Sequence, residues 1–308
     1  MEDACQAMES AFAEEGAGGV VMPPRTNVKA GKGWLRVGPV VLEASGWMGF
    51  KAMNLAPGQG VRYQVHLYRI ETGELASIMD AQHLTTLRTG ATSAVATKRL
   101  ARKGRSVVAV LGSGAEAKAQ LEAMWTLGMV RSARVFSRTA SNRERFAAEF
   151  KSRHNMDIAA VGSAREAVAG SEIVLAAVKS SETVLFGDWL EPGMHVNSVG
   201  TARRDQREID AVTFQKSDIV VVDTREGVFG EAGDAVAAKD VISPADADEL
   251  CELVSGKVAG RVDDQQITLF KSVGTGAQDI ALAALIYQKA SKMGIGTRLD
   301  GFPILKHT

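Results

Sequence analysis

The fold of this chain is decided by residues 107–117, which read VVAVLGSGAEA. The apolar run predicts a buried strand, and the next six residues match the pattern G-x-G-x-x-[G/A] at the start of a predicted helix. Gly112 would allow a tight turn, Gly114 would let a pyrophosphate approach the backbone, and Ala117 would permit close helix packing. The helix N-terminus would offer free N–H groups and partial positive charge to the phosphates. We therefore predict a dinucleotide site, with a purely structural turn as the alternative, and assign its contacts to Gly112, Ser113, Gly114, Ala115 and Glu116.

Strands and helices alternate along the chain after Gly104. The segment 133–137 predicts a second strand and 142–150 a second helix, which extends the glycine loop into a βαβ unit. Further buried strands are expected at Ile158–Val161, Ile173–Val178, His195–Val199, Ile219–Val222 and Ile267–Ser272. Such alternation predicts the α/β class with a doubly wound parallel sheet, here a Rossmann domain over residues 103–275.

The end of the second predicted strand bears on the choice of dinucleotide. An Asp or Glu at this place accepts hydrogen bonds from the ribose hydroxyls of NAD and repels a 2′-phosphate. This strand instead runs into Ser137, Arg138 and Thr139. Two hydroxyls and a guanidinium suit a phosphate dianion, and Arg143 would add charge. We predict NADPH in preference to NADH; if Arg138 only stacks on the adenine or faces solvent, either cofactor fits.

The first hundred residues follow a different pattern. Apolar residues at helical spacing predict a helix over residues 1–15, and short apolar runs separated by turns predict an antiparallel sheet over residues 20–80. Asp80 can cap a following helix, and a last Ala-rich helix is expected over residues 277–292. We predict a mixed α+β domain for substrate binding and dimerisation over residues 1–102, completed by 276–308.

Composition limits the partners of the chain. Thirty-six basic residues balance 36 acidic ones, so the chain lacks the summed positive field that attracts nucleic acid or anionic lipid. Its longest apolar runs are far shorter than the roughly 20 residues of a membrane-spanning helix. Cys5 and Cys251 are the only cysteines and lack metal-ligand spacing, which is typical of a reducing compartment. We expect a cytoplasmic protein that uses no metal and binds neither nucleic acid nor membrane.

The segment after Asp223 contains three closely spaced glycines, at 227, 230 and 233. This composition predicts a glycine-rich loop. Glu231 and Asp234 would lie in that loop, where we expect charged side chains to face solvent rather than an active site.

Several short stretches along nearly the whole chain follow a common order and spacing. They are Pro24-Arg25, Gly49-Phe50-Lys51 with Asn54, Arg88-Thr89-Gly90-Ala91-Thr92-Ser93, the glycine loop, His195-Val196-Asn197-Ser198-Val199-Gly200, Glu208-Ile209-Asp210, Val222-Asp223, Glu231-Ala232-Gly233-Asp234 and Leu269-Phe270-Lys271-Ser272-Val273-Gly274. Together they resemble the ornithine cyclodeaminase and mu-crystallin family, which includes cyclodeaminases, amino-acid dehydrogenases and ketimine reductases.

The resemblance implies a homodimer whose first domain holds the substrate. Arg25 and Lys51 match the Arg and Lys that bind the substrate carboxylate in the family. Arg88 is similar to the arginine of the family's R-T-[AG]-A segment, near the substrate carboxylate and the nicotinamide. For each of these charges the alternative is a solvated surface position. The resemblance further implies cofactor contacts from Val199, Gly200, Thr201, Ser272 and Gly274.

These residue types suit a 2-imino or 2-keto acid as substrate. A carboxylate clamped by a guanidinium and an ammonium fixes C2 relative to the nicotinamide. Lys51, if desolvated beside other cations, would have a lowered pKa and could exchange a proton with the substrate nitrogen.

The chain departs from the family pattern at Ala202. Cyclodeaminases and archaeal-type alanine dehydrogenases carry an Asp there, and an alanine cannot transfer a proton. The segment 200–208 is more similar to the mu-crystallin type, which reduces cyclic ketimines with NADPH. Family members generally also have a strand and a helix turn before the position of Met1.

We therefore expect an NADPH-dependent oxidoreductase that reduces the C=N bond of 2-imino acids, such as cyclic ketimines of the 1-pyrroline-2-carboxylate type, to amino acids. The first alternative is an ornithine cyclodeaminase or an alanine-type amino-acid dehydrogenase. The second is a non-catalytic, crystallin-like protein that binds NADPH and a small ligand.

Overall fold

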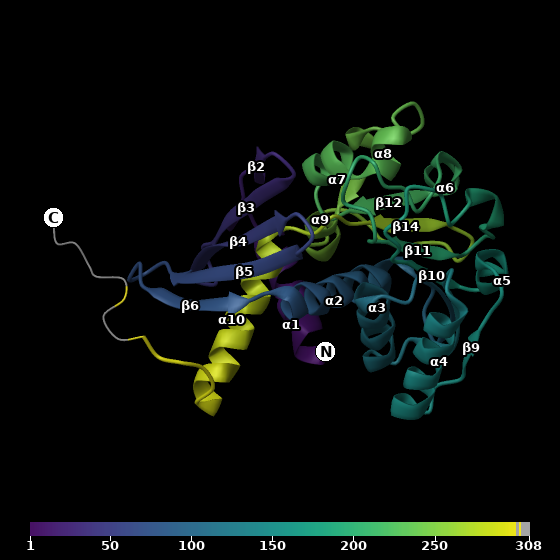
Figure 1. Ribbon diagram of the computed structural model, residues 1–308. Helices are drawn as coiled ribbons and strands as arrows, with labels where there is room; N and C mark the ends of the chain where they lie inside the picture. The colour runs from purple at the N-terminus through teal and green to yellow at the C-terminus, as the bar shows by residue number, and fades with distance from the viewer. Residues whose placement is uncertain (300–301, 303–308) are drawn as a thin grey trace. The chain divides into compact units, whose positions relative to one another are not determined.

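The computed structural model describes residues 1–299 and Phe302, and the chain divides into two compact units (Figure 1). Unit 1 is Met1–Cys5 with Thr89–Gly274, and unit 2 is Gln6–Arg88 with the chain from Thr275 onward. Residues 300–301 and 303–308, at the end of the segment 276–308 assigned to the first domain from sequence, lie outside the described residues. Among the described helices, none combines the length and the hydropathy that a membrane span requires.

Unit 1 is built on an eight-stranded sheet of parallel strands, in the order β13-β12-β14-β11-β10-β7-β8-β9. The strands are β7 (Ser106–Leu111), β8 (Val130–Phe136), β9 (Ile158–Ala160), β10 (Ile173–Ala176), β11 (His195–Ser198), β12 (Ile219–Val222), β13 (Asp248–Glu249) and β14 (Thr268–Lys271). From β7 the chain runs outward through β8 to β9 and then returns to β10, on the other side of β7. The strand order therefore reverses between β7 and β10, which is where open α/β sheets bind their ligands.

Helices connect these strands. They are α3 (Ala115–Thr126), α4 (Ala140–His154), α5 (Ala164–Val168), α6 (Ala211–Lys216), α7 (Arg225–Glu231), α8 (Gly233–Ala237) and α9 (Leu250–Val254), with single 3₁₀ turns at Gly187–Trp189 and Pro244–Asp246. All residues of β10 and of β14 are buried, as expected for strands covered on both faces. The predicted α/β fold with a doubly wound parallel sheet is confirmed.

The predicted glycine-rich loop after Asp223 is wrong, because this segment forms α7 and α8. Gly233 lies against the backbone carbonyl oxygens of Gln206 and Arg204, where a Cβ would not fit. Val228 and Ala235 are buried in the core of unit 1. The glycine at 233 therefore serves close packing of a short helix, whereas the composition alone indicated a turn.

Unit 2 is an antiparallel sheet with one long helix packed on it. The strands are β1 (Val20–Val21), β2 (Thr26–Ala30), β3 (Gly33–Leu42), β4 (Trp47–Ala56), β5 (Gly60–Arg69) and β6 (Leu75–Asp80), and the helix is α10 (Gly276–Met293). Their order is β1-β3-β4-β5-β6, with β2 paired to β3. The predicted antiparallel sheet is therefore present, and α10 packs on β3, β4 and β5.

Two further helices, α1 (Glu2–Gly16) and α2 (Gln82–Leu100), contain the boundaries between the units. The side chain of Asp80 accepts a hydrogen bond from the backbone N–H of Gln82 at 3.0 Å and so caps α2, as the sequence indicated.

The pleat of β4 decides which of its side chains face α10. Trp47, Gly49 and Lys51 lie on one face because strand side chains alternate. At Gly49 a Cβ would approach the Cδ1 atom of Ile280 on α10 to 2.9 Å, so glycine allows the helix to lie close. Lys51, one pleat further along, is directed at the same helix.

Candidate active site

The turn after β7 requires glycine. Gly112 has a φ of 115°, a region that residues with a side chain rarely adopt. A Cβ at this position would also meet the carbonyl oxygen of Ala177 at 2.5 Å. The N–H of Gly112 donates to the carbonyl of Phe136 at 2.8 Å. Gly112 thus lies in close backbone contact with the chain that follows β10 and bonds to the end of β8.

The N-terminus of α3 is shaped to receive a phosphate. Gly114 is the N-cap residue of α3, and no side chain caps the helix there. A Cβ at Gly114 would have no neighbour nearer than Glu116 Oε2, at 3.9 Å, so the backbone is open to a ligand. Ala115 is exposed, whereas Ser113 and Glu116 are half-buried. Ala117, in the first turn of the helix, is fully buried. Uncapped N–H groups beside an open glycine fit the pyrophosphate of a dinucleotide.

The end of β8 leads into the N-terminus of α4, where Thr139 is the N-cap residue. Arg138 and Thr139 are exposed, and Ser137 is half-buried. Arg143 donates from Nη1 to the carbonyl of Ser137 at 2.8 Å, and its guanidinium lies 5.8 Å from the ring centre of Phe136. Arg143 therefore braces this turn, while Arg138 and Thr139 present their polar groups to solvent.

The chain after β11 contains three residues predicted to contact the cofactor, Val199, Gly200 and Thr201. The N–H of Val199 donates to the carbonyl of Ala176 at 3.0 Å, which ties this segment to the end of β10. Val199 and Gly200 are half-buried. Thr201 is fully buried, and its hydroxyl donates to Asp234, so this side chain belongs to an internal cluster.

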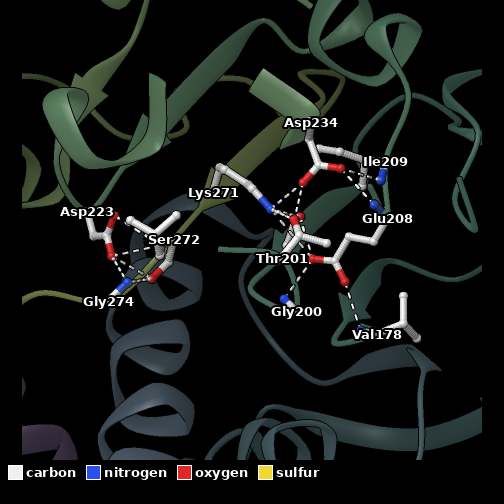
Figure 2. Close-up of polar contacts among 12 residues, drawn as sticks. Val178, Gly200, Thr201, Glu208, Ile209, Asp223, Asp234, Lys271, Ser272 and Gly274 are labelled. Carbon is white, nitrogen blue, oxygen red and sulfur yellow. Dashed lines mark hydrogen bonds and ion pairs between the residues drawn. The ribbon is translucent and has the colours of Figure 1, made fainter. Parts of the chain in front are cut away.

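The other two predicted cofactor residues, Ser272 and Gly274, are both bound by Asp223. Its carboxylate accepts the hydroxyl of Ser272 at 2.7 Å and the N–H of Gly274 at 2.6 Å (Figure 2). Gly274 has a φ of 79°, so the chain turns sharply after β14. Asp223 thus fixes the turn at the end of β14.

A charged cluster lies fully buried in unit 1 (Figure 2). Its residues come from β14, from the segment 200–210 that follows β11, and from α8. Its members are Lys271, Asp234 and Glu208. The Lys271 Nζ lies 2.6 Å from Asp234 Oδ2 and 3.7 Å from Glu208 Oε1. Burial raises the pKa of Glu208, and the ammonium of Lys271 opposes that shift. The expectation that Asp234 faces solvent is wrong, because the residue is only 1% exposed.

Unit 2 contains a second buried cluster of charges, which includes two of the predicted substrate residues. Lys51 Nζ and Arg88 Nε each lie 3.1 Å from the same carboxylate oxygen, Oδ1 of Asp279. Lys51 also donates to the hydroxyl of Thr85 at 2.6 Å, and Arg88 donates from Nη1 to Gln278 Oε1 at 3.0 Å. The three charged residues are 5–8% exposed, so β4, α2 and α10 place two cations against one carboxylate in a nearly dry environment.

Arg25 is the third predicted substrate residue. It is half-buried, and its Cγ atom would lie 3.3 Å from a Cβ built at Gly38 on β3. Its charge is close enough to lower the pKa of Lys51. Unit 2 thus brings all three predicted cations into one electrostatic neighbourhood.

The environment of Lys51 prepares it for proton transfer near neutral pH. Burial lowers the pKa of Lys51 from 10.5 to about 8, and the charges of Arg88 and Arg25 act in the same direction. Asp279 opposes this shift by its charge and by its hydrogen bond. Such a group can both bind an anion and exchange a proton at physiological pH.

Sequence reasoning missed Gln278 and Asp279, which complete the cluster. Both lie in the first turn of α10, a helix otherwise rich in apolar residues. Two adjacent polar residues at the start of an apolar helix were the available signal, but their contacts with Lys51 and Arg88 span about 190 to 230 positions in sequence. Only the folded chain brings these residues together.

The Rossmann sheet with its glycine turn is typical of a dinucleotide-binding protein, and comparison with known proteins identifies its family. A model of the ornithine cyclodeaminase/mu-crystallin family matches residues 1–294, and the chain belongs to this family.

Three relatives illustrate the similarity. Ketimine reductase mu-crystallin of Mus musculus is 32% identical over 289 residues, covering 91% of this chain and 88% of that protein. The structure of Thermococcus litoralis Delta(1)-pyrroline-2-carboxylate reductase in complex with NADH and L-proline has a TM-score of 0.92 at 36% identity, covering 97% of this chain and 96% of that one. An archaeal alanine dehydrogenase dimer with bound NAD has a TM-score of 0.91 at 31% identity, covering 98% of this chain and 95% of that one.

The role of Asp279 in the cationic cluster can be tested directly. In Asp279→Asn the pKa of Lys51 should fall further below its wild-type value, because the charge that opposes desolvation is removed. The measurement is NMR titration of protein carrying ¹³C-labelled lysine, with Lys51→Arg assigning the signal. A Lys51 pKa that stays constant or rises in a folded Asp279→Asn variant would contradict the electrostatic analysis.

Proposed function

We propose that this chain is an NADPH-dependent reductase that acts on the C=N bond of 2-imino acids, with cyclic ketimines of the 1-pyrroline-2-carboxylate type as substrates. The observation that carries the proposal is the buried cluster in which Lys51 and Arg88 share Asp279. Two cations against one carboxylate leave positive charge that a substrate carboxylate can neutralise. Relatives named for ketimine and pyrroline-2-carboxylate reduction support this substrate class.

The chemistry divides between the cofactor and the side chains of unit 2. When bound, reduced nicotinamide supplies a hydride to C2 of the imine. Arg25, Lys51 and Arg88 bind the substrate carboxylate and fix the position of C2. Lys51, with a pKa of about 8, carries a proton at neutral pH and donates it to the substrate nitrogen. Because Lys51 loses this proton as the pH rises through about 8, kcat/KM should fall on the alkaline side.

The preference for NADPH rests on the turn after β8. That turn presents the exposed side chains of Arg138 and Thr139, with Ser137 beside them, and carries no carboxylate. A guanidinium and hydroxyl groups favour a 2′-phosphate, whereas a carboxylate would repel it. The Thermococcus relative was solved with NADH, so the choice between the two cofactors has to be measured on this chain.

The alternative within enzymes is a cyclodeaminase or an alanine-type dehydrogenase. Ala202 argues against a deaminase, because the family's Asp at that place is absent and an alanine cannot move a proton. A reductase consumes NADPH with a cyclic imine, a dehydrogenase needs ammonia with a 2-keto acid, and a cyclodeaminase releases ammonia from ornithine without net cofactor change. A panel of these substrates, followed by NADPH absorbance and ammonia release, separates the three.

A binding protein without turnover is the second alternative. Burial of Lys51 with a pKa of about 8 favours the enzyme, because a ligand-holding ammonium has no need of a pKa near neutrality. A cytoplasmic location remains a prediction from the cysteine content.

We further propose that the chain forms a homodimer through unit 2, as the dimeric alanine dehydrogenase relative supports. The face of its sheet opposite Lys51 carries Leu35, Phe50 and Ile78, which the register of β3 to β6 places on one side. Leu35 is 43% and Ile78 47% exposed. Apolar side chains exposed on one face of a sheet are typical of a surface that binds a partner.

The role of Lys51 predicts different results for two substitutions. Lys51→Met should lower kcat with a cyclic ketimine by roughly 100-fold or more, because both the clamp and the proton donor are lost. Lys51→Arg should keep the KM for substrate near the wild-type value while kcat falls, because the charge remains but the proton is held too tightly. Steady-state kinetics and thermal denaturation test both, and wild-type turnover in Lys51→Met would exclude the enzymatic role.

The proposed contact of Arg138 with the 2′-phosphate predicts that Arg138→Asp weakens the preference for NADPH over NADH. The ratio of kcat/KM with NADPH to that with NADH should fall by roughly 10- to 100-fold, because a hydrogen bond to a charged group contributes about 1.5 to 3 kcal/mol. The matched control is Arg145→Asp, at an exposed arginine on α4, the helix that follows this turn; it should leave the ratio unchanged. An equal effect of both variants would indicate general loss of positive charge.

The proposed dimer surface predicts that the dimer of the Ile78→Asp variant dissociates more readily. The dimer dissociation constant should rise roughly 100-fold or more, because an unpaired charge inside an interface costs about 3 to 5 kcal/mol. Analytical ultracentrifugation measures it, and Val262→Asp, at a valine of unit 1 that is 77% exposed, is the control. A dimer of unchanged stability in Ile78→Asp would place the interface elsewhere.

A further inference from the structure

The reversal of strand order divides the dinucleotide between two halves of the sheet in unit 1. Under the proposed function, on which this inference rests, the turn after β8 binds the adenosine half. The nicotinamide half then belongs to β10 and β11, on the other side of the reversal. The segments that face it are the chain ends after these strands, which include Val178 and Gly200.

These strand ends are packed backbone against backbone. Gly112 lies against the carbonyl oxygen of Ala177. Gly200 lies so close to Val178 that a Cβ there would collide with the Val178 nitrogen and with a carboxylate oxygen of Glu208. The spacing between the two nicotinamide-side strand ends is therefore set by backbone contact and by one inserted side chain.

That side chain, Glu208, accepts backbone hydrogen bonds from both strand ends (Figure 2). Its Oε2 atom accepts the N–H of Val178 at 2.9 Å, and its Oε1 atom accepts the N–H of Gly200 at 2.8 Å. Oε1 also accepts the hydroxyl of Ser198, the last residue of β11, at 2.7 Å. One carboxylate thus bridges the ends of β10 and β11.

The buried cluster holds Glu208 in turn. Asp234 accepts the backbone N–H of Glu208 at 2.7 Å, which fixes the main chain of this residue. Lys271 donates to Ser198 Oγ at 2.9 Å and to Thr201 Oγ1 at 2.7 Å, so both hydroxyls are oriented to donate to the carboxylates. Glu208 is consequently fixed at its backbone, at its carboxylate and through the hydroxyl beside it.

We propose that Glu208 is a positioning residue that holds the backbone amides of Val178 and Gly200 in the arrangement that receives the nicotinamide. Its carboxylate touches neither substrate nor cofactor in this proposal and acts through the two strand ends. A buried ion pair is in general weak evidence for stability, because desolvation offsets its attraction. A carboxylate that bonds to two backbone amides at the ligand-binding edge is better explained by the geometry that it imposes.

The test compares Glu208→Gln with Asp210→Asn. Glutamine keeps the shape of the side chain but has only one acceptor oxygen, so either Val178 or Gly200 loses its partner. Asp210 lies two residues further along and also accepts two backbone amides, from Gly187 and Thr213, each at 2.9 Å. Both amides donate to the same oxygen, Oδ1, which asparagine keeps. The control therefore removes a nearby carboxylate charge by the same acid-to-amide change without affecting the partners of Val178 or Gly200.

Three quantities are measured for each variant: the dissociation constant of NADPH by nicotinamide fluorescence, the dissociation constant of 2′-phospho-ADP-ribose, which lacks the nicotinamide, and kcat. In Glu208→Gln we expect kcat to fall roughly 10- to 100-fold, since misplacement by about 1 Å can cost that much. NADPH should bind more weakly and its fluorescence should change, while the fragment binds within about twofold of wild type. Asp210→Asn should leave the three quantities near wild type.

Two results would overturn the inference. One is a Glu208→Gln variant with wild-type kcat and NADPH affinity, and the other is parallel loss of NADPH and fragment binding. If Glu208→Gln does not fold, Ser198→Ala replaces it; it removes one hydrogen bond to the carboxylate and should weaken NADPH but not the fragment, and unchanged NADPH binding would contradict the proposal. Failure of the proposed function is separate, because wild-type protein would then not bind NADPH or not reduce the imine.

Discussion

The close backbone approach at the carboxyl edge of the parallel sheet constrains the rest of unit 1. Gly112 and Gly200 both lie where a Cβ would strike the chain that follows β10. Strand ends packed this closely leave backbone N–H groups that must find acceptors, since an unpaired buried amide is costly. Glu208 accepts the N–H groups of Val178 and Gly200, and Asp223 accepts the N–H group of Gly274. Burial of such carboxylates in turn requires cations and hydroxyls around them, which accounts for Lys271.

Much of this architecture could be predicted from the sequence, because its signals are local. The apolar run before Gly112 and the alternating strands and helices indicate a parallel sheet without knowledge of any contact. The resemblance of short stretches to the family singled out Lys51, Arg88 and Gly200 as candidate site residues. The segment after Asp223 misled the prediction, because Gly233 makes close contact with residues 204 and 206 rather than a turn.

The charged clusters could not be predicted, since they depend on contacts between distant residues. Lys51 and Asp279 are separated by 228 positions, and Asp234 and Lys271 belong to different elements. When only the neighbours in sequence are considered, a carboxylate near a glycine is predicted to face solvent. Only the fold shows that Asp234 bonds to the backbone of Glu208 and Ile209 and is closed off from water.

The two buried clusters differ in their balance of donors and acceptors, and this difference separates scaffold from site. In unit 1 two carboxylates face one ammonium, and backbone amides and hydroxyls saturate the acceptors that remain. Such a cluster can fix geometry but has no excess positive charge to offer an anionic ligand. In unit 2 two cations face one carboxylate, and desolvation brings the pKa of Lys51 to about 8. An excess of buried positive charge carries a cost in free energy as long as no anion neutralises it. Under the proposed function, the carboxylate of the substrate is the anion that would remove this cost.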